Sequence, residues 1–220
     1  MAPRVEDIFR TLLPREVVVV VATPEMWSEQ LHPVEERYVR GAVTKRIREF
    51  AAGRACARRA LAALGFDNFP LQVVGDRSPL WPAGVLGSIT HTDQFCAAAV
   101  CRRGTIKGFG IDAERAVPLP EDMIPIVCTP NESASLMGFG RPGLWAKLVF
   151  SAKESIYKSY FPETRTFLDF HDVEVSLNRD ENRFVGVLNN DGVPSLCGRR
   201  SFFGSYATSY DILFTVVTVE

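Results

Sequence analysis

Apolar runs separated by glycine, proline and polar residues divide the first half of the chain into short elements. The run at 17–22, made of valines and one alanine, predicts a buried strand. The segment 33–64 is rich in alanine, arginine and leucine and is followed by Gly65, which predicts one or two helices. Further apolar runs predict strands at 71–74, 85–90, 95–101 and 106–112. We therefore expect helices followed by a meander of strands.

The second half of the chain repeats this order. Helical spacing predicts a short helix at 131–136 and a longer one at 143–160, and apolar runs predict strands at 173–177, 183–188, 202–207 and 212–219. The doubled order predicts the α+β class with two halves of similar length, 1–110 and 111–220. A proline-rich stretch at 117–120 is typical of a linker between them.

The predicted helix at 143–160 has an apolar side and a polar side. Its apolar side carries Trp145, Leu148, Val149, Ala152, Ile156 and Tyr160 at helical spacing. The other side carries Lys147, Ser151, Glu154 and Lys158. On an exposed helix, Glu154 and Lys158 would form an ordinary ion pair that contributes about 0.2–0.5 kcal/mol. Because Phe150 and Lys153 lie beside Glu154, we instead expect another part of the protein to cover this side.

The composition is that of an ordinary soluble globular protein, with 46% hydrophobic and 23% charged residues. The formal net charge of −1 argues against nucleic acid as a partner, because proteins that bind the phosphate backbone carry an excess of Lys and Arg. No apolar run is long enough for a membrane span or a signal peptide. The five scattered cysteines form no C-x-x-C pair, so we expect a reduced, cytoplasmic setting.

Positive charge gathers in one segment of this neutral chain. Between Arg37 and Arg59 the only acid is Glu49, whereas the bases include Arg40, Lys45, Arg46, Arg48, Arg54 and Arg58. Such a segment is either a solvated helix face or a binding site for an anion.

Two carboxylates stand at the end of a predicted strand, in the sequence Gly110-Ile-Asp112-Ala-Glu114. Residues two apart on a strand point to the same side, so Asp112 and Glu114 can face one point. Paired carboxylates suit Mg²⁺, which takes its other ligands from water and a substrate phosphate. A solvated strand end would explain the same pair without a metal.

A second strand end carries Ser88, Thr90 and His91, which can all donate hydrogen bonds to phosphate oxygens. A structural role for the histidine is the plainer alternative. The basic segment that precedes these residues would supply the charge that a phosphate ligand needs.

Taken together, three motifs resemble the signatures of 4′-phosphopantetheinyl transferases of the surfactin and enterobactin synthase type. They are GSITHT at 87–92, GIDAE at 110–114 and FSAKESIYK at 150–158. Arg46-x-x-Glu49-Phe50-x-x-x-Arg54 and Trp81-Pro82 precede them in the order that the family shows.

The resemblance implies a monomeric pseudo-dimer of two similar α/β halves with the active site in the cleft between them. It also implies an activity: with Mg²⁺ or Mn²⁺, such enzymes transfer phosphopantetheine from coenzyme A to a serine of an acyl, peptidyl or aryl carrier domain. Adenosine 3′,5′-bisphosphate is released. The pathway that the carrier serves stays open, whether fatty acid, polyketide, peptide or siderophore.

The resemblance assigns roles residue by residue. Asp112, Glu114 and Glu154 fall on the metal carboxylates, and Glu154 or a water held by the metal is the general base. Lys158, with Lys153, neutralises charge on the leaving group.

In the N-terminal half, the resemblance assigns contacts to the phosphates of coenzyme A. These fall on Arg46, Arg54, Arg77, Ser88, Thr90 and His91. One departure concerns the loop before Gly75, where some relatives carry a lysine and this chain has Val74.

Two alternative functions fit the same residues. Carboxylates and bases would also serve a Mg²⁺-dependent phosphohydrolase of nucleotides or coenzyme A. A module that binds coenzyme A or a carrier without catalysis would leave Glu154 and Lys158 as a surface pair.

Overall fold

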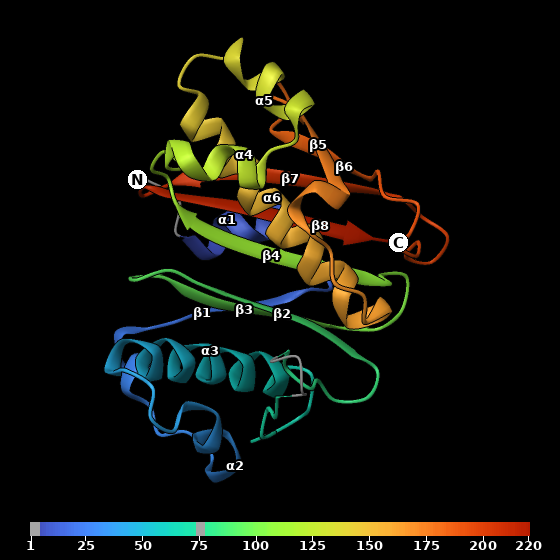
Figure 1. Cartoon of the computed structure of the whole chain (residues 1–220). Helices are drawn as coiled ribbons and strands as arrows, with labels where there is room; N and C mark the ends of the chain where they lie inside the picture. The colour runs from blue at the N-terminus through green and yellow to red at the C-terminus, as the bar shows by residue number, and fades with distance from the viewer. Residues whose placement is uncertain (1–4, 74–77) are drawn as a thin grey trace. The chain divides into compact units, whose positions relative to one another are not determined.

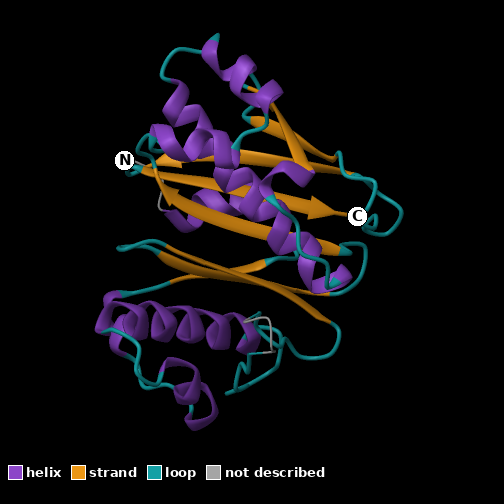
Figure 2. Ribbon diagram, viewed as in Figure 1, coloured by secondary structure: helices purple, strands orange, loops and turns teal. Residues whose placement is uncertain are grey.

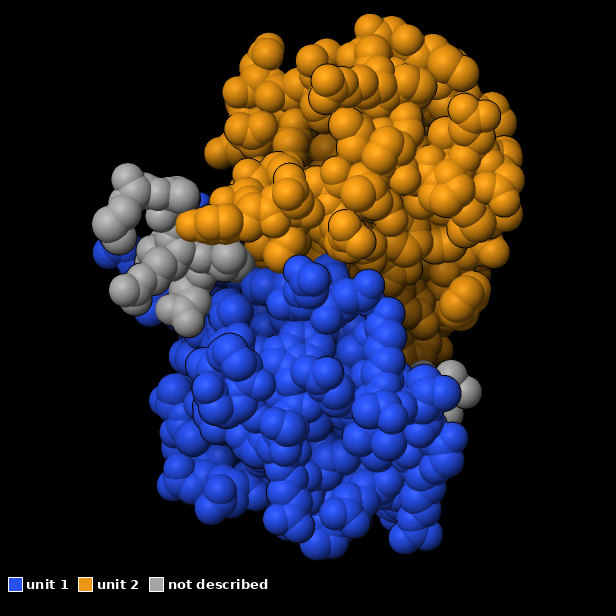
Figure 3. Space-filling view, turned by 90° about the vertical axis from the view of Figure 1, so that its left-hand side faces the viewer, with its two compact units in different colours: residues 1–104 blue, residues 105–220 orange. Residues whose placement is uncertain are grey.

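Each half of the chain folds as a long helix packed on an antiparallel sheet, in a computed structural model that describes residues 5–73 and 78–220 (Figure 1). Two compact units, 1–104 and 105–220, are distinguished by colour in Figure 3. The predicted α+β class with two halves is confirmed. None of the helices in the described ranges combines the length and the hydropathy of a membrane span.

In the first unit, α3 covers a three-stranded sheet with the order β1-β3-β2 (Figure 1). Its elements are α1 (Val5–Leu12), β1 (Val18–Val21), η1 (Pro24–Ser28), α2 (Pro33–Glu36), η2 (Arg37–Val39), α3 (Thr44–Ala62), β2 (Val85–His91) and β3 (Cys96–Arg102). The predicted strand at 71–74 is not formed: Val73 makes only an isolated bridge to Pro79, and Val74 lies outside the described residues.

Small side chains explain how closely α3 packs on this sheet. Ala52, Ala55 and Cys56 of α3 are fully buried against a sheet whose central strand carries three alanines, at 97–99. Alanine also favours the helix itself, because it loses no side-chain entropy on folding. The helix gives way to a turn at Gly65, whose φ of +85° is open to glycine without strain.

In the second unit, α6 lies across a five-stranded sheet with the order β4-β8-β7-β6-β5 (Figure 2). The strands are β4 (Gly108–Arg115), β5 (Val173–Asn178), β6 (Arg183–Leu188), β7 (Ser201–Ser209) and β8 (Ile212–Val219). The helices are η3 (Glu121–Met123), α4 (Ile124–Val127), α5 (Pro130–Met137), α6 (Pro142–Thr164) and η4 (Phe170–Asp172). All the helices and strands expected in this half are present.

The chain divides before β4 and not within it. β4 pairs with β8 along its whole length, from Gly108 opposite Val219 to Arg115 opposite Ile212, so it belongs entirely to the second unit. The stretch 117–120 is also inside this unit, where the Leu119 amide donates to the Gly143 carbonyl at 2.9 Å. It therefore anchors the start of α6 and is not a linker between the halves.

Glycines on β4 let α6 approach the strand unusually closely. A Cβ atom at Gly110 would lie 2.0 Å from the Ser155 carbonyl oxygen, and one at Gly108 would lie 2.8 Å from the Ser159 carbonyl oxygen. Both contacts are with helix backbone, which cannot rotate away. The absence of side chains at these two positions thus fixes the distance between α6 and β4.

We expect Gly110→Ala to destabilise the protein by about 3 kcal/mol or more, because the added methyl must push helix and strand apart. Chemical denaturation gives the free energy of unfolding. Gly138→Ala is the matched control, since Gly138 has a φ of −74° and an added Cβ there would meet no atom closer than 3.6 Å. A Gly110→Ala variant as stable as the control would contradict this account of the packing.

Candidate functional site

The carboxylates of Asp112 and Glu114 lie on the face of β4 that α6 covers. Lys147 Nζ donates to Glu114 Oε2 at 3.3 Å, and Ser151 Oγ donates to Asp112 Oδ2 at 2.8 Å. Both donors are on α6, so the polar side of this helix is covered by the strand, as the sequence predicts. A row of polar contacts therefore runs along the helix–strand interface.

Lys158 extends this row to the next helical turns. Its ammonium donates to Asp112 Oδ1 at 2.6 Å, and its side chain is 26% exposed against 5% for Asp112. Burial alone would lower the pKa of Lys158, but the carboxylates of Asp112 and Glu154 outweigh it and raise that pKa above its usual value. Lys158 is therefore a fixed positive charge over the carboxylates.

Glu154 differs from Asp112 and Glu114 in its bonding. Within residues 5–73 and 78–220, no hydrogen bond or ion pair holds its side chain. Burial raises the pKa of Glu154; Lys158 opposes this, and Asp112 and Glu114 add to it. Burial and then Asp112 also raise the pKa of Glu114. The three carboxylates thus influence one another electrostatically, and Glu154 can accept a proton or another ligand.

The donor set fits Mg²⁺ bound partly by its substrate. Among the described residues, no three His, Cys, Asp or Glu side chains are gathered as a ready-made metal cage. Mg²⁺ rarely needs one, because it is commonly held by one or two carboxylates together with waters and substrate phosphates. Crowded carboxylates that raise one another's pKa would also gain from a neighbouring cation.

Lys153 does not belong to this group, although its sequence neighbour Glu154 does. Its ammonium, 2% exposed, donates to Glu132 Oε2 at 2.7 Å, to the Val127 carbonyl at 2.8 Å and to the Phe170 carbonyl at 2.7 Å. These bonds use all three of its N–H donors. The prediction that Lys153 contacts coenzyme A is therefore wrong: it ties α6 to α4, α5 and η4.

In the first unit, Arg46 of α3 and His91 at the end of β2 lie together. Arg46 Nη1 is 3.3 Å from His91 Nε2, and Glu49 Oε2 is 3.9 Å from both Arg46 Nη1 and His91 Nδ1. Arg46 is exposed and His91 partly so, which leaves a basic pair at the surface beside one carboxylate. Two of the residues that the resemblance assigns to the phosphates of coenzyme A thus lie side by side.

Ser88 and Thr90 do not converge with His91. The burial pattern alternates along β2, so that Ser88 and Thr90, at 4% and 2% exposure, lie on one face and the partly exposed Ile89 and His91 on the other. The interpretation of two hydroxyls and an imidazole at one place is therefore wrong in its geometry, because residues one apart on a strand point to opposite faces.

Three bases of the predicted positive segment are paired with acids inside the unit. Arg58 bonds to Glu35 at 2.6 Å and to Glu29 at 2.9 Å, and Arg59 bonds to Glu29 at 2.7 Å. Lys45 pairs with Asp93. The acids that neutralise these bases are distant in the sequence. A count of charges within the segment alone therefore overstates its positive charge in the folded protein.

Arg54 is the buried member of the segment, at 5% exposure. Its Nε donates to the Leu71 carbonyl at 3.1 Å, and its guanidinium lies 4.2 Å from the centre of the Phe50 ring. Burial lowers its pKa to about 10, so it remains charged at neutral pH. Arg77, the other predicted phosphate contact, lies outside the described residues.

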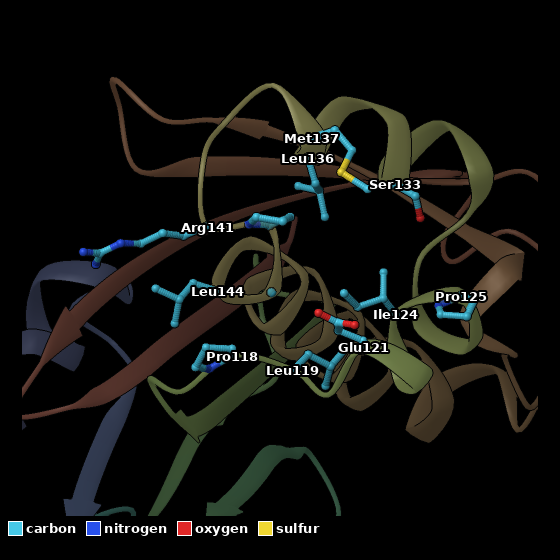
Figure 4. Close-up of a pocket in the computed structure, with 12 residues that line it drawn as sticks. Pro118, Leu119, Glu121, Ile124, Pro125, Ser133, Leu136, Met137, Arg141 and Leu144 are labelled. Atoms are coloured by element: carbon cyan, nitrogen blue, oxygen red, sulfur yellow. The ribbon is translucent and has the colours of Figure 1, made fainter.

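An apolar pocket of about 810 Å³ opens where η3, α4, α5 and the start of α6 meet (Figure 4). Leu119, Ile124, Leu136 and Leu144 line it. None of the carboxylates on β4 or α6 belongs to its lining. It is therefore a feature separate from the polar row.

Sequence reasoning did not identify three residues of these clusters as site residues: Ser151, Thr215 and Glu49. Ser151 lies three residues before Glu154 and seven before Lys158, so helical spacing alone could have included it. Thr215 could not have been found this way, because only the pairing of β8 with β4 brings it opposite Asp112.

Two family models and several characterised relatives are similar to this chain. A model of the 4′-phosphopantetheinyl transferase N-terminal domain matches residues 34–101, and one of the 4′-phosphopantetheinyl transferase superfamily matches residues 108–210. The 4′-phosphopantetheinyl transferase Svp of Streptomyces mobaraensis is 40% identical over 86% of this chain and 78% of its own. The 4′-phosphopantetheinyl transferases Npt of Nocardia iowensis and PptT of Mycobacterium tuberculosis are 35% and 34% identical, over 96% and 86% of this chain and 99% and 87% of theirs.

We expect Lys153→Met to cost about 3–5 kcal/mol of unfolding free energy, because it leaves Glu132 buried without its cation. Lys147→Met is the matched control: it breaks the less buried pair with Glu114 and should cost clearly less than Lys153→Met. Denaturation curves of both variants decide this. A Lys153→Met protein of normal stability but weakened affinity for coenzyme A would restore the ligand role rejected above.

Proposed function

Because the chain belongs to the 4′-phosphopantetheinyl transferase superfamily, we propose that it transfers phosphopantetheine from coenzyme A to a serine of a carrier protein. The serine oxygen bonds to the phosphorus that carries the pantetheine arm, and the bond from that phosphorus to the bridging oxygen breaks. The serine gives up its proton, and adenosine 3′,5′-bisphosphate leaves. The observation that supports this proposal most directly is the row of carboxylates and lysines where α6 packs on β4: Asp112, Glu114, Glu154, Lys147 and Lys158.

Glu154 is proposed as the group that takes the serine proton. Its carboxylate is partly buried and held by no hydrogen bond or ion pair in the described chain, and its raised pKa increases its affinity for a proton. A general base of this kind contributes about 10²–10⁴-fold to a rate. Neither a cysteine nor a histidine nucleophile is required, since phosphoryl transfer depends mainly on positioning and electrostatics.

Lys158 and the carboxylates of β4 are proposed to stabilise charge. The ammonium of Lys158, held by Asp112 at 2.6 Å, is a donor for an oxygen of the pyrophosphate or of the leaving group. Asp112 and Glu114, with Glu154, would hold Mg²⁺ or Mn²⁺. The chemistry that such an ion supplies is the neutralisation of charge on the pyrophosphate.

In the first unit, Arg46 and His91 are proposed to bind the phosphates of coenzyme A. Arg46 Nη1 donates to His91 Nε2 at 3.3 Å, which holds the guanidinium at the surface with further N–H donors that suit the 3′-phosphate. Arg54 adds positive charge nearby, since Arg46 and Arg54 are close enough that each charge disfavours the other. Ser88 and Thr90, on the opposite face of β2, are left out of this contact.

Intact-protein mass spectrometry tests the activity. With coenzyme A and Mg²⁺, an apo-carrier should gain the mass of phosphopantetheine on its serine. Glu154→Gln should slow transfer about 10²–10³-fold, because the proton acceptor is lost. Asp112→Ala should abolish transfer at ordinary Mg²⁺, and Glu121→Gln, which removes an exposed acid of the same unit, should change little.

Three results would contradict the transferase. Hydrolysis of coenzyme A without a carrier would favour the phosphohydrolase. Binding without turnover, indifferent to Glu154→Gln, would favour a binding module. An unmodified serine across a panel of apo-carriers would remove the transferase altogether.

The 3′-phosphate contact has its own test. Arg46→Ala should raise the KM for coenzyme A about 10- to 100-fold, as expected from losing a charged hydrogen bond of about 1.5–3 kcal/mol. With 3′-dephospho-coenzyme A, the variant and the wild type should have similar KM values. Arg48→Ala is the matched control, because Arg48 is an exposed arginine two residues further along the same helix, where it lines a pocket with Trp27. If Arg46→Ala raised the KM equally for coenzyme A and for 3′-dephospho-coenzyme A, Arg46 would not contact the 3′-phosphate.

A further inference from the structure

Three buried side chains from three elements meet where α6 crosses the sheet. Asp112 of β4 and Thr215 of β8 are direct cross-strand partners, and Ser151 of α6 packs over both. Their exposed fractions are 3%, 0% and 0%. Ser151 Oγ is 2.8 Å from Asp112 Oδ2 and 2.9 Å from Thr215 Oγ1, and Thr215 Oγ1 is 2.9 Å from the Ser151 carbonyl oxygen.

The protons available determine the direction of these bonds. An ionised carboxylate only accepts, so the Ser151 hydroxyl must donate to Asp112. The Thr215 hydroxyl then supplies its proton to Ser151, at the hydroxyl or at the carbonyl oxygen. A donor chain that ends on a carboxylate is strengthened by its own polarisation. Thr215 therefore holds Ser151, through its hydroxyl or its backbone carbonyl, and Ser151 in turn donates to Asp112.

Neighbouring serines of α6 show that this arrangement is not the default for a buried hydroxyl. Ser155 and Ser159 are equally buried, and their hydroxyls donate within the helix, to the carbonyls of Ala152 at 2.8 Å and Ile156 at 2.7 Å. Ser151 could be satisfied in the same way but donates to a strand carboxylate instead. Its burial alone does not require that bond.

The chain completes the restraint on Asp112. Lys158 holds Oδ1 at 2.6 Å and Ser151 holds Oδ2 at 2.8 Å, so rotation of the carboxylate would break one bond or the other. Glu114, by contrast, is held by Lys147 at 3.3 Å with 28% of its side chain exposed.

We infer that Ser151 and Thr215 are positioning residues, a hydroxyl relay that sets the orientation in which Asp112 meets a divalent cation. This inference rests on the proposed function, because it assigns the metal to Asp112. Residues that orient a metal ligand typically affect metal affinity by about 10–100-fold. The relay also explains why the fully buried position opposite Asp112 on β8 is a threonine among apolar neighbours.

The test measures metal binding separately from turnover. Mn²⁺ binding to the full chain with coenzyme A present is followed by electron paramagnetic resonance, and the KM for Mg²⁺ is taken from transfer rates. Ser151→Ala should weaken Mn²⁺ about tenfold and raise the KM for Mg²⁺ similarly, with kcat at saturating Mg²⁺ within about threefold of wild type.

Matched variants separate positioning from folding. Ser155→Ala, which removes an equally buried hydroxyl one turn away, should bind Mn²⁺ as the wild type does. Thr215→Val keeps the shape and loses the hydroxyl, so it should weaken Mn²⁺ binding, and Thr215→Ser should restore it. If Ser151→Ala does not fold, the comparison of Thr215→Val with Thr215→Ser still tests the inference.

The possible failures are distinct. A wild type that transfers phosphopantetheine, with Ser151→Ala and Thr215→Val both binding Mn²⁺ normally, would overturn the relay alone. A wild type that neither binds Mn²⁺ with coenzyme A nor modifies a carrier would overturn the relay and the proposed function together.

Discussion

The close approach of α6 to β4 is the constraint on which the candidate site depends. Steps of four residues along the helix match steps of two along the strand, from Gly108 beside Ser159 and Gly110 beside Ser155 to Asp112 beside Ser151 and Glu114 beside Lys147. Four helical residues rise about 6.0 Å and two strand residues about 6.6 Å, so the register holds over this length. Glycines at one end of the interface thus bring charged side chains together at the other.

This register also explains the electrostatics of the site. Carboxylates held against a helix lose hydration, which raises the pKa of Glu114 and Glu154, and lysines from the same helix offset part of that cost. The three carboxylates do not share these compensating contacts equally. Asp112 is bonded to Lys158 and Ser151, whereas Glu154 has no bonded partner in the part of the chain that the structure describes. One carboxylate is thereby suited to hold a fixed position and another to exchange a proton.

Periodicity predicted the parts of the site that lie within single elements. The shared face of Asp112 and Glu114 follows from the two-residue repeat of a strand, and that of Glu154 and Lys158 from the helical repeat. Periodicity gave the wrong surroundings for Lys153. This residue is next to Glu154 in the sequence, but α4, α5 and η4 pack on its side of the helix. Thr215 was beyond reach for the same reason, since its role depends on which strands pair.

The same limit applies to the charges of the first unit, and there it sharpens the proposal. Glu29, Glu35 and Asp93, distant in the sequence, neutralise Arg58, Arg59 and Lys45. Pairing of these three bases lowers the positive charge of the segment, and Arg46 lies at its surface beside His91 and Glu49. Paired charges contribute little to long-range attraction, so we expect recognition of the 3′-phosphate to depend on the short-range geometry of Arg46 and His91, and 3′-dephospho-coenzyme A is the substrate that tests this.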